Sequence, residues 1–146
     1  MDLIKGYPRS VRDKFAGVVQ LGRATDKGRA LAAGTIGEYH YNCPMDQAVF
    51  GFLGIDHDAY LGLIKAGKSD SELQSYARDF VEKKSHAEVD EWNANFLNYA
   101  PEAGSDGEKY FLELRNSVAP DRTDVTAWAD LLDLDEKRQV PHRVAA

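Results

Sequence analysis

The chain has 146 residues, of which 43% are hydrophobic and 29% are charged, and its net charge is −6 at pH 7. This composition is typical of one globular domain, and the acidic balance argues against a nucleic-acid partner, because such binders usually present a basic face. No apolar run reaches the roughly 20 residues that span a bilayer, so we expect no membrane partner.

The single cysteine, Cys43, and the first residues of the chain favour a cytoplasmic location. One cysteine cannot form an internal disulfide, which is typical of a reducing compartment. Residues 1–6 have no apolar core of a signal peptide. We expect a single helical domain over residues 1–138 and a flexible tail over residues 139–146. The oligomeric state stays open.

The first 35 residues carry an excess of positive charge, whereas the rest of the chain is acidic. Basic side chains in this segment can hold the carboxylate or phosphate of a small anionic ligand. The candidate contacts are Arg12, Arg23 and Lys27, and Asp26 shares a helix face with the last two. The same side chains can equally form a solvated face with salt bridges to Asp13 and Asp26, and both interpretations stay open.

In chain order, the first predicted elements are a helix start at Ser10, a helix over residues 21–33 and a semi-extended segment near residues 35–44. Ser10 stands three residues before an acid, which is the spacing of a capping box. Within residues 21–33, small residues on one face would let another helix approach closely. Glycines then mark a break, and the strand-like composition of residues 35–42 favours an extended backbone.

The next predicted helix follows Cys43. Pro44 suits the first helical position, because its missing N–H would have no partner there. Cys43 then becomes the N-cap, and Asp46 becomes the third helical residue. A thiol at a helix N-terminus lies beside unpaired N–H groups and the positive end of the dipole, and both favour the thiolate.

The remaining pattern is helical as well. Further capping boxes begin at three serines and two aspartates are candidate caps, namely Ser69, Ser85, Ser105, Asp56 and Asp124. Apolar residues at i, i+3, i+4 and i+7 follow most of these starts, and they place Trp92 and Trp128 in the core. We therefore predict an all-α fold, a compact single-domain multi-helix bundle of six to eight helices.

The most informative stretch for function is Gly37–Gln47, which contains Glu38, His40 and Cys43. Cysteine catalysis needs a thiolate, a base beside it and a group that orients the base. Cys43 is the candidate nucleophile, His40 the acid–base group and Glu38 its orienting carboxylate. Asp46 opposes the thiolate because it adds negative charge. In the structural alternative, Cys43 is a small buried residue and His40 bonds a backbone carbonyl.

Two further interpretations concern the same stretch. Tyr39, Tyr41 and Asp46 are candidate ligand contacts, although aromatic residues more often belong to a core. A metal site would combine His40 and Cys43 with a third ligand from Asp46, His57 or His86, but none of the recognised zinc-binding pairs is present. We therefore predict no metal site, and the cofactor is left open.

Four segments carry a resemblance to a known family, and these are Gly6–Ser10, Asp26–Ala30, Gly37–Asp46 and Trp128–Asp133. They resemble a bacterial family catalogued as domain of unknown function 5069. The similarity runs over nearly the whole chain, and residues after Arg138 lie outside the pattern. The resemblance implies a family identity and implies no mechanism.

Two functional hypotheses follow from these residues. The first is a small cytoplasmic enzyme that acts on a small anionic molecule through a Cys/His site at a helix N-terminus. The second is a non-catalytic ligand-binding or protein-assembly module, in which the same residues only fix a turn. The exposure of Cys43 and the partners of its sulfur distinguish the two.

Overall fold

The computed structural model describes residues 1–143 and confirms the all-α prediction. The described chain holds seven helices, α1 (Leu21–Ala33), α2 (Pro44–Leu53), α3 (His57–Lys65), α4 (Asp70–Val81), α5 (His86–Leu97), α6 (Asp106–Val118) and α7 (Trp128–Asp135). Just over half of these residues are helical, and residues 1–143 contain no strand. None of these helices has both the length and the apolar character needed to cross a membrane.

Most helix starts lie where the sequence places them. Cys43 is the N-cap of α2, with Pro44 in the first turn. The Ser69 oxygen accepts from the backbone N–H of Glu72 at 3.2 Å, and the Glu72 carboxylate accepts from the backbone N–H of Ser69 at 3.2 Å. Ser85 forms the same reciprocal pair ahead of α5. These caps satisfy N–H groups that have no partner within their own helix.

Two predicted starts are wrong. Ser10 and Asp13 make half of a capping box, since Asp13 accepts from the backbone N–H of Ser10 at 3.1 Å, whereas Ser10 Oγ accepts from the backbone N–H of Arg12 at 3.1 Å. The residues that follow form turns instead of a helix, with positive φ at Ala16 (54°), Gly17 (81°) and Gln20 (70°). A right-handed helix cannot continue through such residues.

Asp124 is not a cap either, because α7 begins only at Trp128 with Ala127 as its N-cap. The Asp124 carboxylate instead accepts two hydrogen bonds from the Arg122 guanidinium, at 3.0 and 3.1 Å.

The segment 35–44 is less extended than predicted. It forms two turns, and Gly37 (φ 62°) and Asn42 (φ 61°) adopt left-handed backbone.

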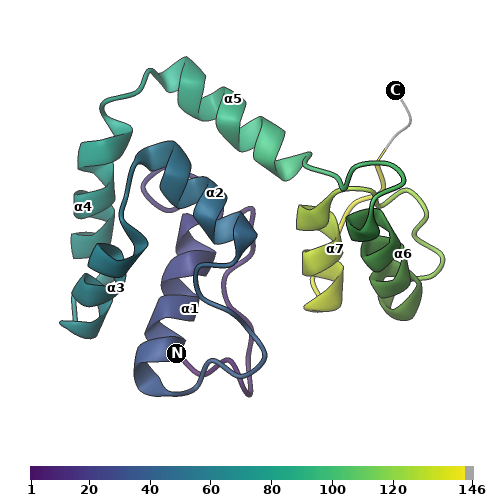
Figure 1. Cartoon of the computed structure of the whole chain (residues 1–146), viewed down its shortest axis with the longest axis horizontal. Coiled ribbons are helices and arrows are strands. Elements are labelled where there is room, and N and C mark those ends of the chain that lie inside the picture. Colours follow the sequence, from purple (N-terminus) through teal and green to yellow (C-terminus); the bar gives the residue numbers. More distant parts are fainter. Residues whose placement is uncertain (144–146) are drawn as a thin grey trace. The chain divides into compact units, whose positions relative to one another are not determined.

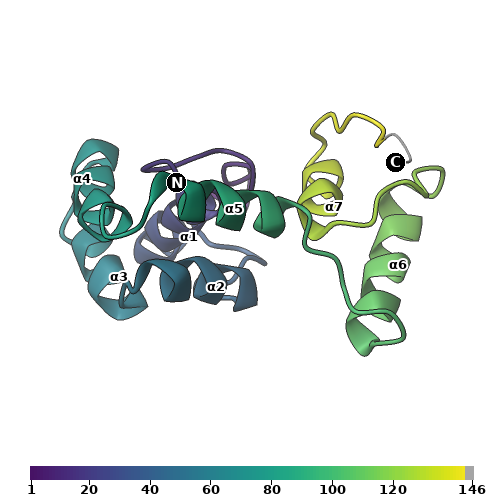
Figure 2. The same ribbon diagram turned by 90° about the horizontal axis from the view of Figure 1, so that it is seen from above.

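The chain divides into two compact units, Met1–Asn93 and Ala94–Ala146. In the first unit, α1 packs against α2 and α3, and α2 packs against α4 (Figures 1 and 2). Gly28 allows the close approach of α3 to α1. A Cβ atom at this position would lie 2.7 Å from Ile64 Cδ1 and 3.2 Å from Tyr41 Cε1. The small-residue face predicted for this helix is therefore confirmed.

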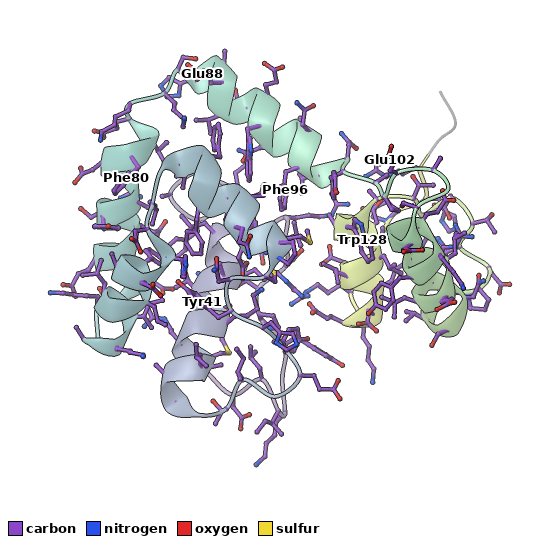
Figure 3. The ribbon with its side chains drawn as sticks, viewed as in Figure 1. Tyr41, Phe80, Glu88, Phe96, Glu102 and Trp128 are labelled. Atoms are coloured by element: carbon purple, nitrogen blue, oxygen red, sulfur yellow. The ribbon has the colours of Figure 1, made fainter. Side chains whose placement is uncertain are left out.

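The second unit is built on α6 and α7, with Phe111, Val125 and Leu131 buried between them. Trp128 of α7, labelled in Figure 3, is half-buried. It packs edge-on against Phe111, with ring centroids 4.9 Å apart. Trp92, in the first unit, is also half-buried and stacks on Phe52 at 4.7 Å. Both tryptophans thus border a core instead of filling its centre.

Part of the segment expected to be a tail makes tertiary contacts. Val140 is buried, and its carbonyl accepts a hydrogen bond from the Arg122 guanidinium at 2.8 Å. Arg143 donates to Asp130 at 2.6 Å and to Asn98 at 2.6 Å. Residues 144–146 of the expected tail lie outside the described residues, and the proposed domain limits stay a prediction.

Candidate functional site

One face of α1 carries polar side chains that are almost completely buried. Gln20, Arg23 and Lys27 stand at i, i+3 and i+7, so they line a single face of this helix. They expose only 1%, 4% and 3% of their surface. Charged side chains are almost never this buried unless they are paired. The partners of this face therefore define the site.

Lys27 pairs with Asp46 in the interior. Lys27 Nζ lies 2.7 Å from Asp46 Oδ2, and Asp46 has no exposed surface. The carboxylate also accepts from Gln20 Nε2 at 2.8 Å and from the backbone N–H of Asn42 at 3.1 Å. A buried ion pair is tolerated only when further hydrogen bonds satisfy its charges. Three donors from separate parts of the chain do so here.

The thiol of Cys43 completes this cluster. Lys27 Nζ lies 3.3 Å from Cys43 Sγ and donates a hydrogen bond to it, so one ammonium joins the carboxylate and the sulfur. Cys43 is partly exposed, whereas Lys27 behind it is buried. The sulfur makes no capping hydrogen bond to its own helix. A partly exposed sulfur beside a cation and a helix N-terminus is the environment of a reactive cysteine.

Within residues 1–143, two buried oxygens at the cluster have no hydrogen-bond partner, namely Gln20 Oε1 and Asn42 Oδ1. Their residues also adopt backbone conformations that side chains rarely favour, with φ of 70° at Gln20 and 61° at Asn42. Such conformations cost free energy and persist only where the surroundings enforce them. Both residues bond Asp46, so the carboxylate holds the turns that bracket the site.

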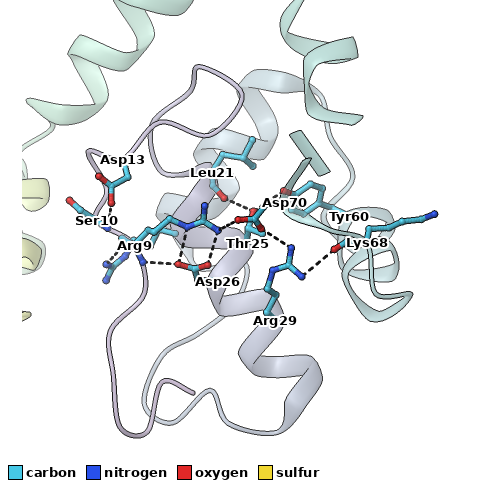
Figure 4. A network of polar contacts seen from close by, with 11 residues as sticks. Arg9, Ser10, Asp13, Leu21, Thr25, Asp26, Arg29, Tyr60, Lys68 and Asp70 are labelled. Atoms are coloured by element: carbon cyan, nitrogen blue, oxygen red, sulfur yellow. Dashed lines mark hydrogen bonds and ion pairs between the residues drawn. The ribbon is translucent and has the colours of Figure 1, made fainter. Parts of the chain in front are cut away.

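A second polar cluster lies on another face of α1 (Figure 4). Asp26 accepts three hydrogen bonds from Arg9, namely from the backbone N–H at 2.8 Å, from Nε at 3.1 Å and from Nη2 at 2.9 Å. Asp70, at the start of α4, bridges Arg9 at 3.2 Å and Arg29 at 2.7 Å. Burial lowers the pKa of Arg9, but the hydrogen bonds and charges of Asp26 and Asp70 outweigh this and raise it overall.

Two buried hydroxyls flank these clusters. Tyr60 shares a hydrogen bond of 2.7 Å with Thr25, and burial raises the pKa of Tyr60 to about 12. Tyr41 donates to the His57 carbonyl at 2.8 Å (Figure 3). Burial, and then the charge of Asp46, raise the pKa of Tyr41 above its ordinary range. Both phenols stay neutral near pH 7 and act as hydrogen-bonding groups of the core.

The other candidate residues lie apart from the thiol. Glu38 and His40 are exposed, and within residues 1–143 neither side chain bonds Cys43. Arg12 is exposed as well. Arg23 donates to the Arg9 carbonyl at 3.2 Å, and its guanidinium lies 5.7 Å from the Tyr39 ring centroid. The structure therefore unites Lys27, Cys43 and Asp46, and it places Arg23 beside Tyr39.

Sequence reasoning missed Gln20 and Asp70, and it did not pair Asp46 with Lys27. The i, i+3, i+7 spacing of Gln20 with Arg23 and Lys27 was the available signal for the first. Asp70 stands inside a capping box and gives no sign of its partners Arg9 and Arg29. Asp46 was expected to oppose a thiolate. Its charge is instead neutralised by Lys27, so the carboxylate fixes the ammonium against the sulfur.

The metal alternative finds no donor set in the part of the chain that the structure describes. No three His, Cys, Asp or Glu side chains of residues 1–143 lie close enough together to hold a metal ion. The candidate site is therefore a cysteine, a lysine and a carboxylate.

The family model for a domain of unknown function, DUF5069, matches residues 5–138. The chain belongs to this family. The match includes every residue of the Lys27, Cys43 and Asp46 cluster, as well as Gln20 and Asn42. No match was found among curated proteins. The family resemblance of the sequence is thus confirmed.

Proposed function

We propose that this protein is a cysteine-dependent enzyme that acts on a small anionic molecule, with Cys43 as the nucleophile. The observation that carries the proposal is the 3.3 Å contact between Cys43 Sγ and the buried ammonium of Lys27. A fixed cation beside a partly exposed sulfur stabilises the thiolate, which is the reactive form.

Each neighbour has a role in this proposal. Lys27 stabilises the thiolate, and Asp46 holds the ammonium in place. The first N–H groups of α2 have no acceptor within their helix, so they favour an anionic substrate group or an oxyanion that forms during attack. His40 and Glu38 lie on the surface just before Cys43, and we propose His40 as the proton donor to a leaving group and Glu38 as its orienting group.

Two alkylating probes test this function directly. Iodoacetate and iodoacetamide carry the same leaving group, but only iodoacetate is anionic. We expect native Cys43 to react with both, and we expect the rate ratio of iodoacetate to iodoacetamide to be several-fold higher than for the unfolded chain. Cys43→Ser is the control for labelling at other residues. A ratio equal to or below that of the unfolded chain would contradict an anion-selective thiol.

A non-catalytic module remains the second candidate, and one observation favours it. Asp46 accepts hydrogen bonds from Gln20 and Asn42 while it pairs with Lys27, so the network also fixes two strained turns. A structural role predicts that Cys43→Ser melts like the wild type and that the native thiol resists both probes. We propose a cytoplasmic location in either case, since a single free thiol suits a reducing compartment.

A further inference from the structure

The geometry points to a reversible covalent bond between Lys27 and Cys43, formed when a peroxide oxidises the thiol. This inference goes beyond the proposed catalysis. It concerns oxidation of the protein itself, and it needs no substrate. The side chains involved already touch, because Lys27 Nζ and Cys43 Sγ lie 3.3 Å apart.

Oxidised Cys43 has no second thiol to react with inside the chain, because the sequence contains one cysteine. A cysteine thiolate that meets a peroxide becomes a sulfenic acid, and a sulfenic acid condenses with a thiol or with a nitrogen. Lys27 Nζ is a nitrogen within hydrogen-bond distance of the sulfur. Lys27 is also buried, so its amine is shielded from water.

The first step is oxidation by hydrogen peroxide. The thiolate sulfur attacks one peroxide oxygen, so an S–O bond forms and the O–O bond breaks. The sulfur loses two electrons, the peroxide is reduced, and the departing hydroxide takes a proton to become water. Cys43 is partly exposed, which gives a small oxidant access to the sulfur. The product is the sulfenic acid of Cys43.

The second step is condensation without further oxidation. The Lys27 ammonium first transfers a proton to the Asp46 carboxylate, which lies 2.7 Å away. The neutral amine then attacks the sulfur, so an S–N bond forms and the S–O bond breaks. The departing hydroxide takes one of the two protons left on the nitrogen and leaves as water, and the other proton stays on the nitrogen. The product is a sulfenamide that joins α1 to the N-terminus of α2.

Gln20 explains how the interior accommodates this proton transfer. Its Nε2 donates to Asp46 Oδ1 at 2.8 Å, whereas Lys27 faces the other carboxylate oxygen, Oδ2. The transferred proton therefore goes to Oδ2, and Oδ1 keeps the hydrogen bond from Gln20. Two buried charges become two neutral groups, and this change favours the linked state in a buried site.

The test is a peptide map of the oxidised native protein. After hydrogen peroxide and trypsin, we expect residues 24–29 joined to residues 30–65, because a modified Lys27 resists cleavage. The joined mass should be two hydrogen atoms below the sum of the two peptides. Dithiothreitol should release both peptides, since a thiol attacks the S–N bond and restores the amine.

Matched variants identify the nitrogen. Lys27→Arg keeps a cation beside Asp46 but removes the amine, so we expect no linked peptide and several-fold more capture of sulfenic acid by dimedone. Lys68→Arg, at an exposed lysine, should link as the wild type does. Asp46→Asn should slow linking several-fold, because the proton acceptor is lost.

Two results would overturn the inference. One is native wild-type Cys43 that proceeds to the sulfinic acid with no linked peptide. The other is linking that persists in Lys27→Arg, which would mean that another nitrogen reacts. The mass of the linked peptide reports the S–N bond alone, so this bond can be absent in a protein whose thiol still reacts selectively with the anionic probe. The opposite result, an S–N bond without charge-selective alkylation, is measured by the same two experiments.

Discussion

Two faces of one helix, α1, bury ion pairs in different ways. On one face, Asp26 receives three hydrogen bonds from Arg9, and about a third of the Arg9 side chain still reaches solvent. On the other face, Lys27 and Asp46 expose 4% and 0% of their side chains, and the same ammonium contacts a thiol. The Arg9 guanidinium directs two donors at the Asp26 carboxylate, whereas the Lys27 ammonium is shared between the Asp46 carboxylate and the Cys43 sulfur.

The difference shows which pair is suited to chemistry. A guanidinium does not lose its proton in proteins, and its planar fork satisfies a carboxylate completely. A lysine ammonium is a point charge that can transfer a proton when it is buried. The Arg9 face therefore fixes the fold, and the Lys27 face combines a nucleophile, a mobile proton and an unpartnered amide oxygen.

The largest expected effect comes from removal of the buried cation. Lys27→Met leaves the Asp46 carboxylate without its countercharge in the interior. We expect a loss of about 3–5 kcal/mol of unfolding free energy, because an uncompensated buried charge is strongly destabilising. Urea denaturation measures this loss. The double variant Lys27→Met with Asp46→Asn should recover part of it, and no recovery would mean that the charge of Asp46 is not the cause.

The matching change on the other face should cost less. Arg9→Met removes two side-chain donors from Asp26 and the ion pair with Asp70, but the backbone N–H of residue 9 still donates to Asp26, and the Arg9 side chain is already about a third exposed. We expect a loss of about 2 kcal/mol, typical of hydrogen bonds to a charged group. The comparison of the two faces depends on which variant loses more unfolding free energy, and urea denaturation of both variants measures this. Equal losses for Arg9→Met and Lys27→Met would remove the distinction between the faces.

A smaller effect concerns alkaline pH and Tyr60. The pKa of Tyr60 is raised by burial from 10.0 to about 12, so above pH 10 the unfolded chain loses this proton while the folded chain keeps it. Stability is therefore full below pH 10 and falls as the pH rises toward 12. One unit above the ordinary pKa, the loss should be about 1 kcal/mol. Tyr60→Phe should reduce the alkaline slope of the melting temperature, and an unchanged slope would contradict the assignment.

The sequence predicts the helices well because their signals are local. Pro44 and Cys43 mark the start of α2, and the serine boxes mark later starts, since caps act within one turn. The helix start predicted at Ser10 was wrong because the hydrogen bond between Ser10 and Asp13 forms in a turn as readily as in a helix. Positive φ at Ala16 and Gln20 depends on tertiary packing, and no local pattern announces it.

The site was only half predictable for a similar reason. Cys43 and Asp46 share one helix start, so sequence spacing brings them together. Lys27 comes from another helix, and its contact with the thiol depends on how α1 packs against α2. Proximity in sequence also favoured His40 and Glu38, but the turn that ends at Asn42 leaves both side chains on the surface. Their proposed roles remain predictions.

The alkylation rate of the native thiol is the most direct test of whether Lys27 and the start of α2 activate Cys43. Iodoacetamide is applied at neutral pH to the folded protein and to the same chain unfolded in guanidinium chloride. If Lys27 and the start of α2 stabilise the thiolate of Cys43, the folded protein reacts about tenfold faster, although its thiol is less exposed. A thiol that reacts only after unfolding would contradict a stabilised thiolate and leave Cys43 as a structural residue.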